Sequence, residues 1–189
     1  QVGAVIVSPD NQIVGIGCNE VPKAGGGMYW EGNQFDSRDF RLGYDSNAKI
    51  RDEIVADLLR CLKTKWLSKN LRSKTIEELL RLALYEKPNP ILKGSLVTNL
   101  LEYGRIVHAE MTALSSAALS GLSTKGATLY CTTFPCHNCT RQIIASGIMR
   151  VVYIEPYAKS KAEVLYSEVI SVDGNSTHTR PSVTFEPFS

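Results

Sequence analysis

The sequence predicts an α/β domain built in three layers, with a partly parallel sheet at its centre. Two observations carry this prediction. The second half of the chain alternates short apolar runs with amphipathic stretches of roughly 10–12 residues, a pattern typical of strands joined by helices. The first 17 residues indicate a hairpin, because two apolar runs flank a Pro-Asp-Asn turn.

The expected elements follow one another in a regular order. Strands over residues 2–7 and 13–17 form the hairpin, and irregular chain rich in Gly and Asn follows to about residue 45. The later elements are helix 109–120, strand 127–132, helix 136–146, strand 151–154, helix 160–170 and strand 183–185.

The stretch between these two parts is too long for a simple connection. We therefore expect one domain over 1–189 in which about 31–104 is a mostly helical insertion. Apolar residues recur there at three- and four-residue steps over 50–62 and 76–84, which predicts two helices. The first residues of the sequence already belong to a strand, so we expect a chain cropped at its N-terminus.

Composition narrows the classes of function. Hydrophobic residues make up 43% of the 189 and charged residues 21%, both ordinary for a globular protein. No apolar run approaches the roughly 18 residues that cross a membrane, so no membrane partner is expected. The net charge of +2 is too small to argue for nucleic acid. One loose basic cluster is interpreted as a solvated helix face rather than a binding patch: Lys63, Lys65, Lys69, Arg72 and Lys74.

Five cysteines at uneven spacing make a poor disulfide framework in a chain of this length. A reducing compartment, with some cysteines used for metal, explains them more economically, and we expect a cytoplasmic protein. Cys61 and Cys131 are expected to be core residues.

Two short motifs carry chemistry. His108 and Glu110 stand at the start of one expected helix, and Cys136 and Cys139, preceded by Pro135, stand at the start of the next. Cysteines three apart at a helix start lie on one face, so both sulfurs can reach one ion, and the helix dipole favours thiolates there. One histidine and two thiolates make three protein ligands, which leaves the fourth tetrahedral position of a zinc ion for water.

Glu110 is the expected catalytic residue. Zinc lowers the pKa of its water toward neutrality, and a carboxylate must then move the proton to the ring nitrogen and on to the leaving ammonia. The order H-x-E followed by P-C-x-x-C is the signature of zinc-dependent nucleobase deaminases. The alternative is a closed structural site, which normally needs four protein ligands. His137 lies inside the C-x-x-C turn and is poorly placed to be the fourth.

With these motifs in place, the chain resembles the deoxycytidylate deaminase group of the cytidine deaminase-like superfamily. The matching runs are His-Ala-Glu-Met-Thr-Ala-Leu at 108–114, Gly-Ala-Thr-Leu-Tyr at 126–130 and Pro-Cys-His-Asn-Cys at 135–139. The opening hairpin through Asn19 and the strand that leads to Tyr157 match as well. The resemblance covers 1–30 and about 105–189, and it implies a three-layer α/β/α fold with a mixed sheet of about five strands.

The run 19–30, Asn-Glu-Val-Pro-Lys-Ala-Gly-Gly-Gly-Met-Tyr-Trp, is a narrower match. It is similar to bacterial antiphage dCTP/dCMP deaminases, which deplete deoxycytidine nucleotides during infection. The resemblance implies one catalytic zinc ion, deamination of dCTP or dCMP to dUTP or dUMP with release of ammonia, a nucleotide effector and a homo-oligomer. It places Asn19 at the sugar of the substrate, and Ala109, Pro135 and Tyr157 around the bound nucleotide.

Five further residues are candidates for phosphate or effector contact. Consecutive glycines let backbone N–H groups approach phosphate oxygens, and a neighbouring lysine adds charge. These conditions are met by Lys23, Gly25, Gly26 and Gly27, although a flexible turn is the alternative for the glycines. Lys159 follows the end of a strand, where ligands often bind in open α/β sheets.

The chain also departs from the resemblance. Antiphage members resemble fusions with an N-terminal P-loop kinase-like domain, which is not visible here, and the chain looks cut before the family's usual end. A second, structural zinc site cannot be assembled from the remaining residues, and His178 is expected at the surface.

Two other functions stay open. A deaminase of tRNA or single-stranded DNA shares the zinc motifs but needs a basic groove with stacking aromatics, so nucleic acid is the less favoured partner. A catalytically silent nucleotide-sensing subunit is the other alternative, and the intact Glu110 favours an enzyme instead.

Overall fold

The computed structural model describes residues 2–174 and 180–189, and His178 lies outside them. The chain forms two compact units. The sheet unit comprises Gln1–Asp36 and Ile106–Ser189, and the helical unit comprises Ser37–Arg105. The helical unit overlaps the stretch of about 31–104 that was expected to be an insertion.

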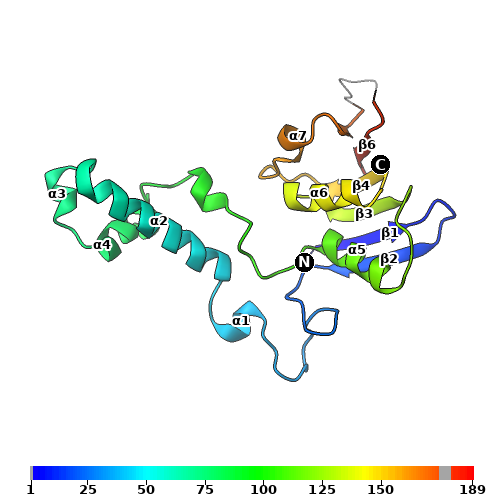
Figure 1. Ribbon diagram of the computed structural model, residues 1–189, viewed down its shortest axis with the longest axis horizontal. Coiled ribbons are helices and arrows are strands. Elements are labelled where there is room, and N and C mark those ends of the chain that lie inside the picture. The colour runs from blue at the N-terminus through cyan, green and yellow to red at the C-terminus, as the bar shows by residue number, and fades with distance from the viewer. Residues whose placement is uncertain (1, 175–179) are drawn as a thin grey trace. The chain divides into compact units, whose positions relative to one another are not determined.

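The sheet unit contains one mixed sheet of six strands in the order β2-β1-β3-β4-β6-β5. Strand β1 pairs antiparallel with β2 and with β3, whereas the pairs β3–β4, β4–β6 and β6–β5 are parallel (Figure 1). The expected α/β class with a mixed sheet is confirmed, with six strands where about five were expected. The strands are β1 (Gly3–Val7), β2 (Ile13–Cys18), β3 (Thr128–Thr133), β4 (Arg150–Glu155), β5 (Ile170–Val172) and β6 (Val183–Pro187).

Side chains that point alternately to the two faces of the sheet build the core of this unit. Ile6, Leu129, Val151 and Phe185 lie side by side across four strands, and none of the four is exposed to solvent. This row points to the face of the sheet that the helices cover, since successive strand residues point to opposite faces. Burial of one such face gives the sheet its register, because a shift by one residue would turn the whole row outward.

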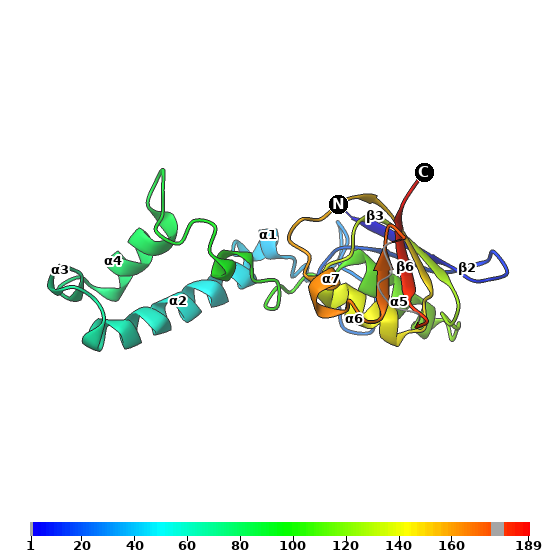
Figure 2. The same cartoon turned by 90° about the horizontal axis from the view of Figure 1, so that it is seen from above.

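Two longer helices follow strands and pack against this face. They are α5 (Ala109–Leu119) and α6 (His137–Ala145), and Figure 2 shows both on the same side of the sheet. Helix α5 presents Ala109, Ala113 and Ala117, all fully buried, toward the sheet. Opposite them, a Cβ atom at Gly15 would lie 2.4 Å from the Ala113 carbonyl oxygen. Small residues on both elements therefore allow the two backbones to approach closely.

The helix expected over 160–170 is wrong in length. The structure has only α7 (Ala162–Leu165), and the chain then turns and enters β5. Ile170 and Val172 are β-branched, and they pair with Val183 and Phe185 of β6. Sheet pairing therefore overrides the helical pattern at the end of this stretch.

The helical unit contains α1 (Asp39–Leu42), α2 (Ser46–Lys65), α3 (Lys69–Arg72), α4 (Ile76–Leu80), the π-helical turn η1 (Arg81–Tyr85) and the 3₁₀ turn η2 (Leu96–Asn99). The helices predicted over 50–62 and 76–84 are confirmed, the second as α4 continued by η1. Thr75 starts α4 with a capping box to Glu78.

The core of this unit is small. Its buried apolar residues are Val55, Ala56, Leu79 and Ala83. Cys61, which was expected in a core, is exposed instead, because the buried part of α2 is limited to Val55 and Ala56, more than one turn before it. Cys131 of β3 is buried as expected. None of the described helices is long and apolar enough to span a membrane.

Candidate metal centre

The first zinc-ligand candidate, His108, occupies the N-cap position of α5 in an extended conformation. The backbone position of His108 is set by the residue before it, because Val107 and Glu20 exchange backbone hydrogen bonds of 3.0 and 3.2 Å. The chain that leaves β2 thereby fixes the start of α5. His108 itself is partly buried.

The two cysteines belong to the start of α6. Cys136 is the N-cap residue and Cys139 lies in the first turn, so their sulfurs share one side of the helix, as the three-residue spacing predicts. Cys136 is 3% exposed and Cys139 is fully buried, which excludes a role as surface thiols.

The three side chains converge on one point. Nδ1 of His108 lies 3.3 Å from Sγ of Cys136 and 3.3 Å from Sγ of Cys139. The three ligand atoms all lie within 4.8 Å of one another. A tetrahedral zinc ion, with Zn–S near ~2.3 Å and Zn–N near ~2.0–2.1 Å, separates nitrogen from sulfur by about 3.6 Å. The predicted ligands therefore fit a zinc ion with small adjustments.

The electrostatics of the pair suit a metal as well. Hydrogen bonding from Cys139 lowers the pKa of the Cys136 thiol to about 4, and His108 contributes in the same direction. The same pairing, together with burial, raises the pKa of Cys139. The two cysteines thus hold one thiolate between them, and a divalent cation would displace the remaining proton.

Glu110 lies in the first turn of α5 and is 4% exposed. Burial raises the pKa of its carboxyl group above the ordinary value. A carboxyl whose pKa moves toward neutrality both accepts and returns a proton readily, as a general acid–base catalyst must. The group of possible metal ligands found among the described residues contains His108, Cys136 and Cys139 but not Glu110.

Comparison with known proteins decides the family. Residues 1–155 match the model of the cytidine and deoxycytidylate deaminase zinc-binding region. The chain belongs to this deaminase family. Zinc is accordingly the metal of the centre, and His108, Cys136 and Cys139 are the residues that can hold it.

Among curated relatives, the deoxycytidylate deaminase of Enterobacteria phage T2 is 36% identical over 83 residues, which are 44% of this chain and 43% of that protein. The deoxycytidylate deaminase of phage T4 is 47% identical over 55 residues, 29% of this chain and 28% of that one. ComE operon protein 2 of Bacillus subtilis is 43% identical over 53 residues, 28% of each chain. The chain therefore spans less than half the length of the curated relatives it matches.

Solved structures include the dCMP deaminase of cyanophage S-TIM5 in complex with dCMP and dUMP. It is 17% identical, with a TM-score of 0.47, and the match covers 100% of this chain and 81% of that one.

The deaminase residues expected around the nucleotide occupy different positions relative to the zinc ligands. Ala109 and Pro135 are fully buried, each directly beside a ligand in the chain. Tyr157 is partly exposed, and the pKa of its hydroxyl is raised by burial first and then by the charge of Cys136, which places it near that ligand. Asn19 follows β2, and its Oδ1 accepts a 2.7 Å hydrogen bond from the Val2 backbone N–H.

The glycine-rich loop lies away from the zinc ligands. A Cβ atom at Gly26 would contact Leu119 at 3.4 Å, so the loop lies beside the last residue of α5. His108 caps the other end of that helix, about 16 Å away at 1.5 Å per residue. The loop is closed by backbone hydrogen bonds between Lys23 and Gly27 and between Gly26 and Lys23. Lys159 is exposed on the segment that follows β4.

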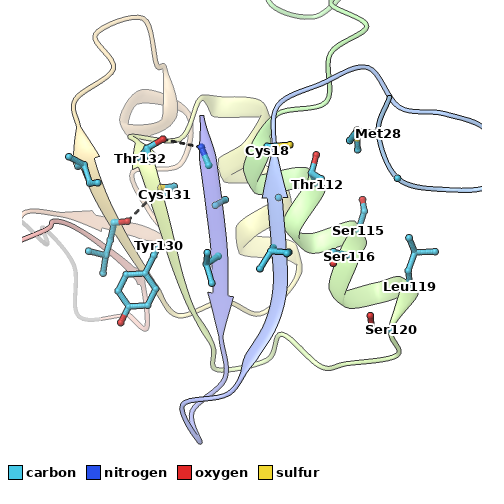
Figure 3. A pocket seen from close by; sticks show the side chains of 18 of the residues that line it. Cys18, Met28, Thr112, Ser115, Ser116, Leu119, Ser120, Tyr130, Cys131 and Thr132 are labelled. Carbon is cyan, nitrogen blue, oxygen red and sulfur yellow. Dashed lines mark hydrogen bonds between the residues drawn. The ribbon is translucent and has the colours of Figure 1, made fainter. Parts of the chain in front are cut away.

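A hollow of about 970 Å³ adjoins this loop but not the zinc ligands. Figure 3 shows it over β1, β2 and β3 and along α5, with Tyr130, Thr132, Ser115 and Leu119 among its lining residues. Neither Glu110 nor any of the three ligands lines it. This hollow is therefore separate from the residues proposed for the chemistry.

One hydrogen bond at the metal centre could not be predicted from the sequence. The Ser160 hydroxyl donates a 2.9 Å hydrogen bond to the backbone carbonyl of Pro135, directly before Cys136. The two residues are 25 positions apart and belong to no shared motif. Only the fold brings them together.

Proposed function

We propose that this chain catalyses the zinc-dependent hydrolytic deamination of a deoxycytidine nucleotide. The observation that carries the proposal is the cluster of His108, Cys136 and Cys139 with the buried carboxyl of Glu110 beside it. Three protein ligands leave one position of a tetrahedral zinc ion for a reactant, which is the arrangement of catalytic rather than structural sites.

The chemistry replaces the exocyclic amine of cytosine by oxygen from water. Zinc bound at this centre supplies a Lewis acid that lowers the pKa of a water molecule toward neutrality. Glu110 accepts the proton that the water gives up and delivers it to N3 of the ring. The hydroxide that remains forms a bond to C4. The same carboxyl takes up the proton of this new C4 hydroxyl and passes it to the amine, so that the C4–N bond breaks, ammonia leaves and uracil remains. Burial of Glu110 suits this exchange because it brings the pKa of the carboxyl closer to neutrality.

The substrate class rests on the relatives. Phage T2 and T4 proteins that match this chain are named deoxycytidylate deaminases, and a solved structural neighbour is described with dCMP and dUMP. In the present chain, Asn19 and Tyr157 are the candidates for contact with the sugar of the nucleotide. Asn19 uses Oδ1 to hold Val2, and its amide nitrogen is not part of that bond.

We extend the proposal to dCTP and to a role in antiphage nucleotide depletion. Support comes from the run 19–30, which carries the loop of Lys23 and Gly25–Gly27. Because Gly26 lies beside Leu119, at the end of α5 opposite the zinc ligands, this loop is better suited to a nucleotide effector than to the substrate phosphate. A cytoplasmic location and a homo-oligomeric state belong to the same proposal, the former supported by five unpaired cysteines.

A panel of cytosine substrates tests the proposal. Zinc-loaded protein is incubated separately with dCMP, dCTP, deoxycytidine and a cytosine-containing oligonucleotide, and ammonia release is measured. We expect turnover of dCMP or dCTP well above that of the nucleoside. Turnover of the oligonucleotide alone would establish the polynucleotide deaminase instead. Nucleotide binding without ammonia release would establish the silent sensor.

A further inference from the structure

The end of β4 and the segment that follows it are attached at two points to the turn before Cys136, through the consecutive residues Phe134 and Pro135. Phe134 donates its backbone N–H to the carbonyl oxygen of Glu155 at 2.7 Å. The backbone carbonyl of Pro135, the next residue along the chain, accepts a hydrogen bond from the hydroxyl of Ser160 at 2.9 Å. Tyr157 lies between these two attachments, and its own carbonyl accepts the backbone N–H of Ser160 at 2.9 Å.

The second attachment bears directly on a metal ligand. The carbonyl of Pro135 belongs to the peptide plane that joins Pro135 to Cys136. Rotation of that plane changes the backbone angle φ of Cys136 and therefore the direction of its side chain. Cys136 holds φ −69° and ψ 165° at the N-cap of α6. A hydrogen bond to this carbonyl consequently restricts the position of Sγ without touching the sulfur.

Ser160 is itself held in place. Its Oγ accepts the backbone N–H of Ala162 at 3.2 Å while it donates to Pro135. Ala162 is fully buried at the start of α7, which packs against α6 (Figure 1). With both roles of the hydroxyl used inside the protein, its donor direction is determined.

We propose that Ser160 is a positioning residue that binds the Tyr157 turn to the peptide before Cys136, so that a wall of the nucleotide site and a zinc ligand move as one piece. The part that concerns the nucleotide rests on the proposed function. The part that concerns zinc retention does not.

The proposal predicts a change in zinc exchange. Release of zinc from the loaded protein to a coloured chelator is followed for the wild type, Ser160→Ala and Ser160→Thr. Loss of one hydrogen bond next to a ligand should accelerate release by about threefold to tenfold in Ser160→Ala. Ser160→Thr keeps the hydroxyl and should release zinc at the wild-type rate.

Two further variants separate this role from general destabilisation. Ser146→Ala is a matched control, since the Ser146 hydroxyl donates a 2.8 Å bond to the carbonyl of Ile143 at the other end of α6. It should leave zinc release unchanged. Ser160→Asp keeps an acceptor for the Ala162 N–H but has no donor for Pro135 at neutral pH. It should release zinc as fast as Ser160→Ala, and it serves in place of that variant if the alanine does not fold.

The nucleotide provides the second readout. dUMP should slow zinc release from the wild type, and this protection should shrink in Ser160→Ala, with KM for dCMP rising more than kcat falls. Zinc release within twofold of the wild type in both Ser160→Ala and Ser160→Asp would overturn the proposal. Equal acceleration in Ser146→Ala would overturn it too. If no substrate is turned over but the zinc rates change as expected, the proposed function fails while the positioning role stands.

Discussion

Gly17 and Ala109 bring the backbones of β2 and α5 into direct contact. A Cβ atom at position 17 would lie 2.2 Å from the carbonyl oxygen of Ala109 and 2.4 Å from the backbone nitrogen of Ala113. Ala109 stands between His108 and Glu110, so this contact sets the depth at which the start of α5 enters the zinc centre.

Substitution of Gly17 should therefore damage both the fold and the centre. Gly17→Ala forces β2 and α5 apart, and we expect a loss of about 2–3 kcal/mol in the free energy of unfolding with weaker zinc retention. Gly3→Ala is the control, because its nearest neighbour would be the Thr132 methyl at 3.9 Å. Urea unfolding measures the stability of the two variants. Equal urea midpoints for both would contradict the close contact between β2 and α5.

Substitution of Cys139 tests whether the three proposed ligands hold the zinc ion. Cys139→Ser places a hydroxyl that does not ionise near neutral pH where the zinc ion requires a thiolate, so zinc content should fall from one ion per chain to nearly none. Cys18→Ser is the control, since Cys18 is unpaired and lies outside the ligand cluster. The metal content of both variants, measured by atomic emission, checks this. Full zinc content in Cys139→Ser would show that the ion is held elsewhere.

The environment of Tyr153 predicts that the protein becomes less stable at alkaline pH. Its hydroxyl donates a 3.0 Å hydrogen bond to Asp173, and burial first, then this bond, raises the pKa of Tyr153 to about 12. In the unfolded chain the pKa is about 10. The neutral hydroxyl is thus favoured by folding, and its stabilisation is complete below pH 10 and is lost as the pH rises toward 12.

The matching variant is Tyr153→Phe. It should be less stable than the wild type by about 1 kcal/mol at pH 8, because it lacks the bond to Asp173. The difference should close between pH 10 and 12, because the phenol of the unfolded wild type ionises there while the folded state still requires the neutral form. Thermal unfolding across that range measures it, and a gap that stays constant with pH would disprove the assignment.

Short-range motifs explain how much of the centre could be predicted. Cys136 and Cys139 are three residues apart at the start of one helix, so local geometry alone brings both to one side of it. His108 and Glu110 are two residues apart, which places both at the start of the other helix. Burial of both helix starts against the same sheet then joins the two pairs, and alternation in the second half of the chain predicts that arrangement.

The remaining features depend on contacts between distant residues. No pattern near Ser160 indicates its bond to Pro135, and the helical periodicity before Ile170 hides a strand that only pairing with β6 reveals. The glycine-rich loop shows the same limit. Gly25–Gly27 have the backbone freedom that phosphate contact needs, each with positive φ, but the contact of Gly26 with Leu119 places them far along α5 from His108.

Glu110→Gln tests the central claim most directly. The substitution keeps the shape of a side chain that is 4% exposed but removes its ability to accept and return a proton. Ammonia release from dCMP and zinc content are measured together in the wild type and the variant. We expect one ammonia per dUMP in the wild type, and turnover lower by about 10²–10⁴-fold in Glu110→Gln with one zinc ion retained. Undiminished turnover in the variant, or loss of its zinc, would contradict the role of Glu110 as the proton carrier of a zinc deaminase.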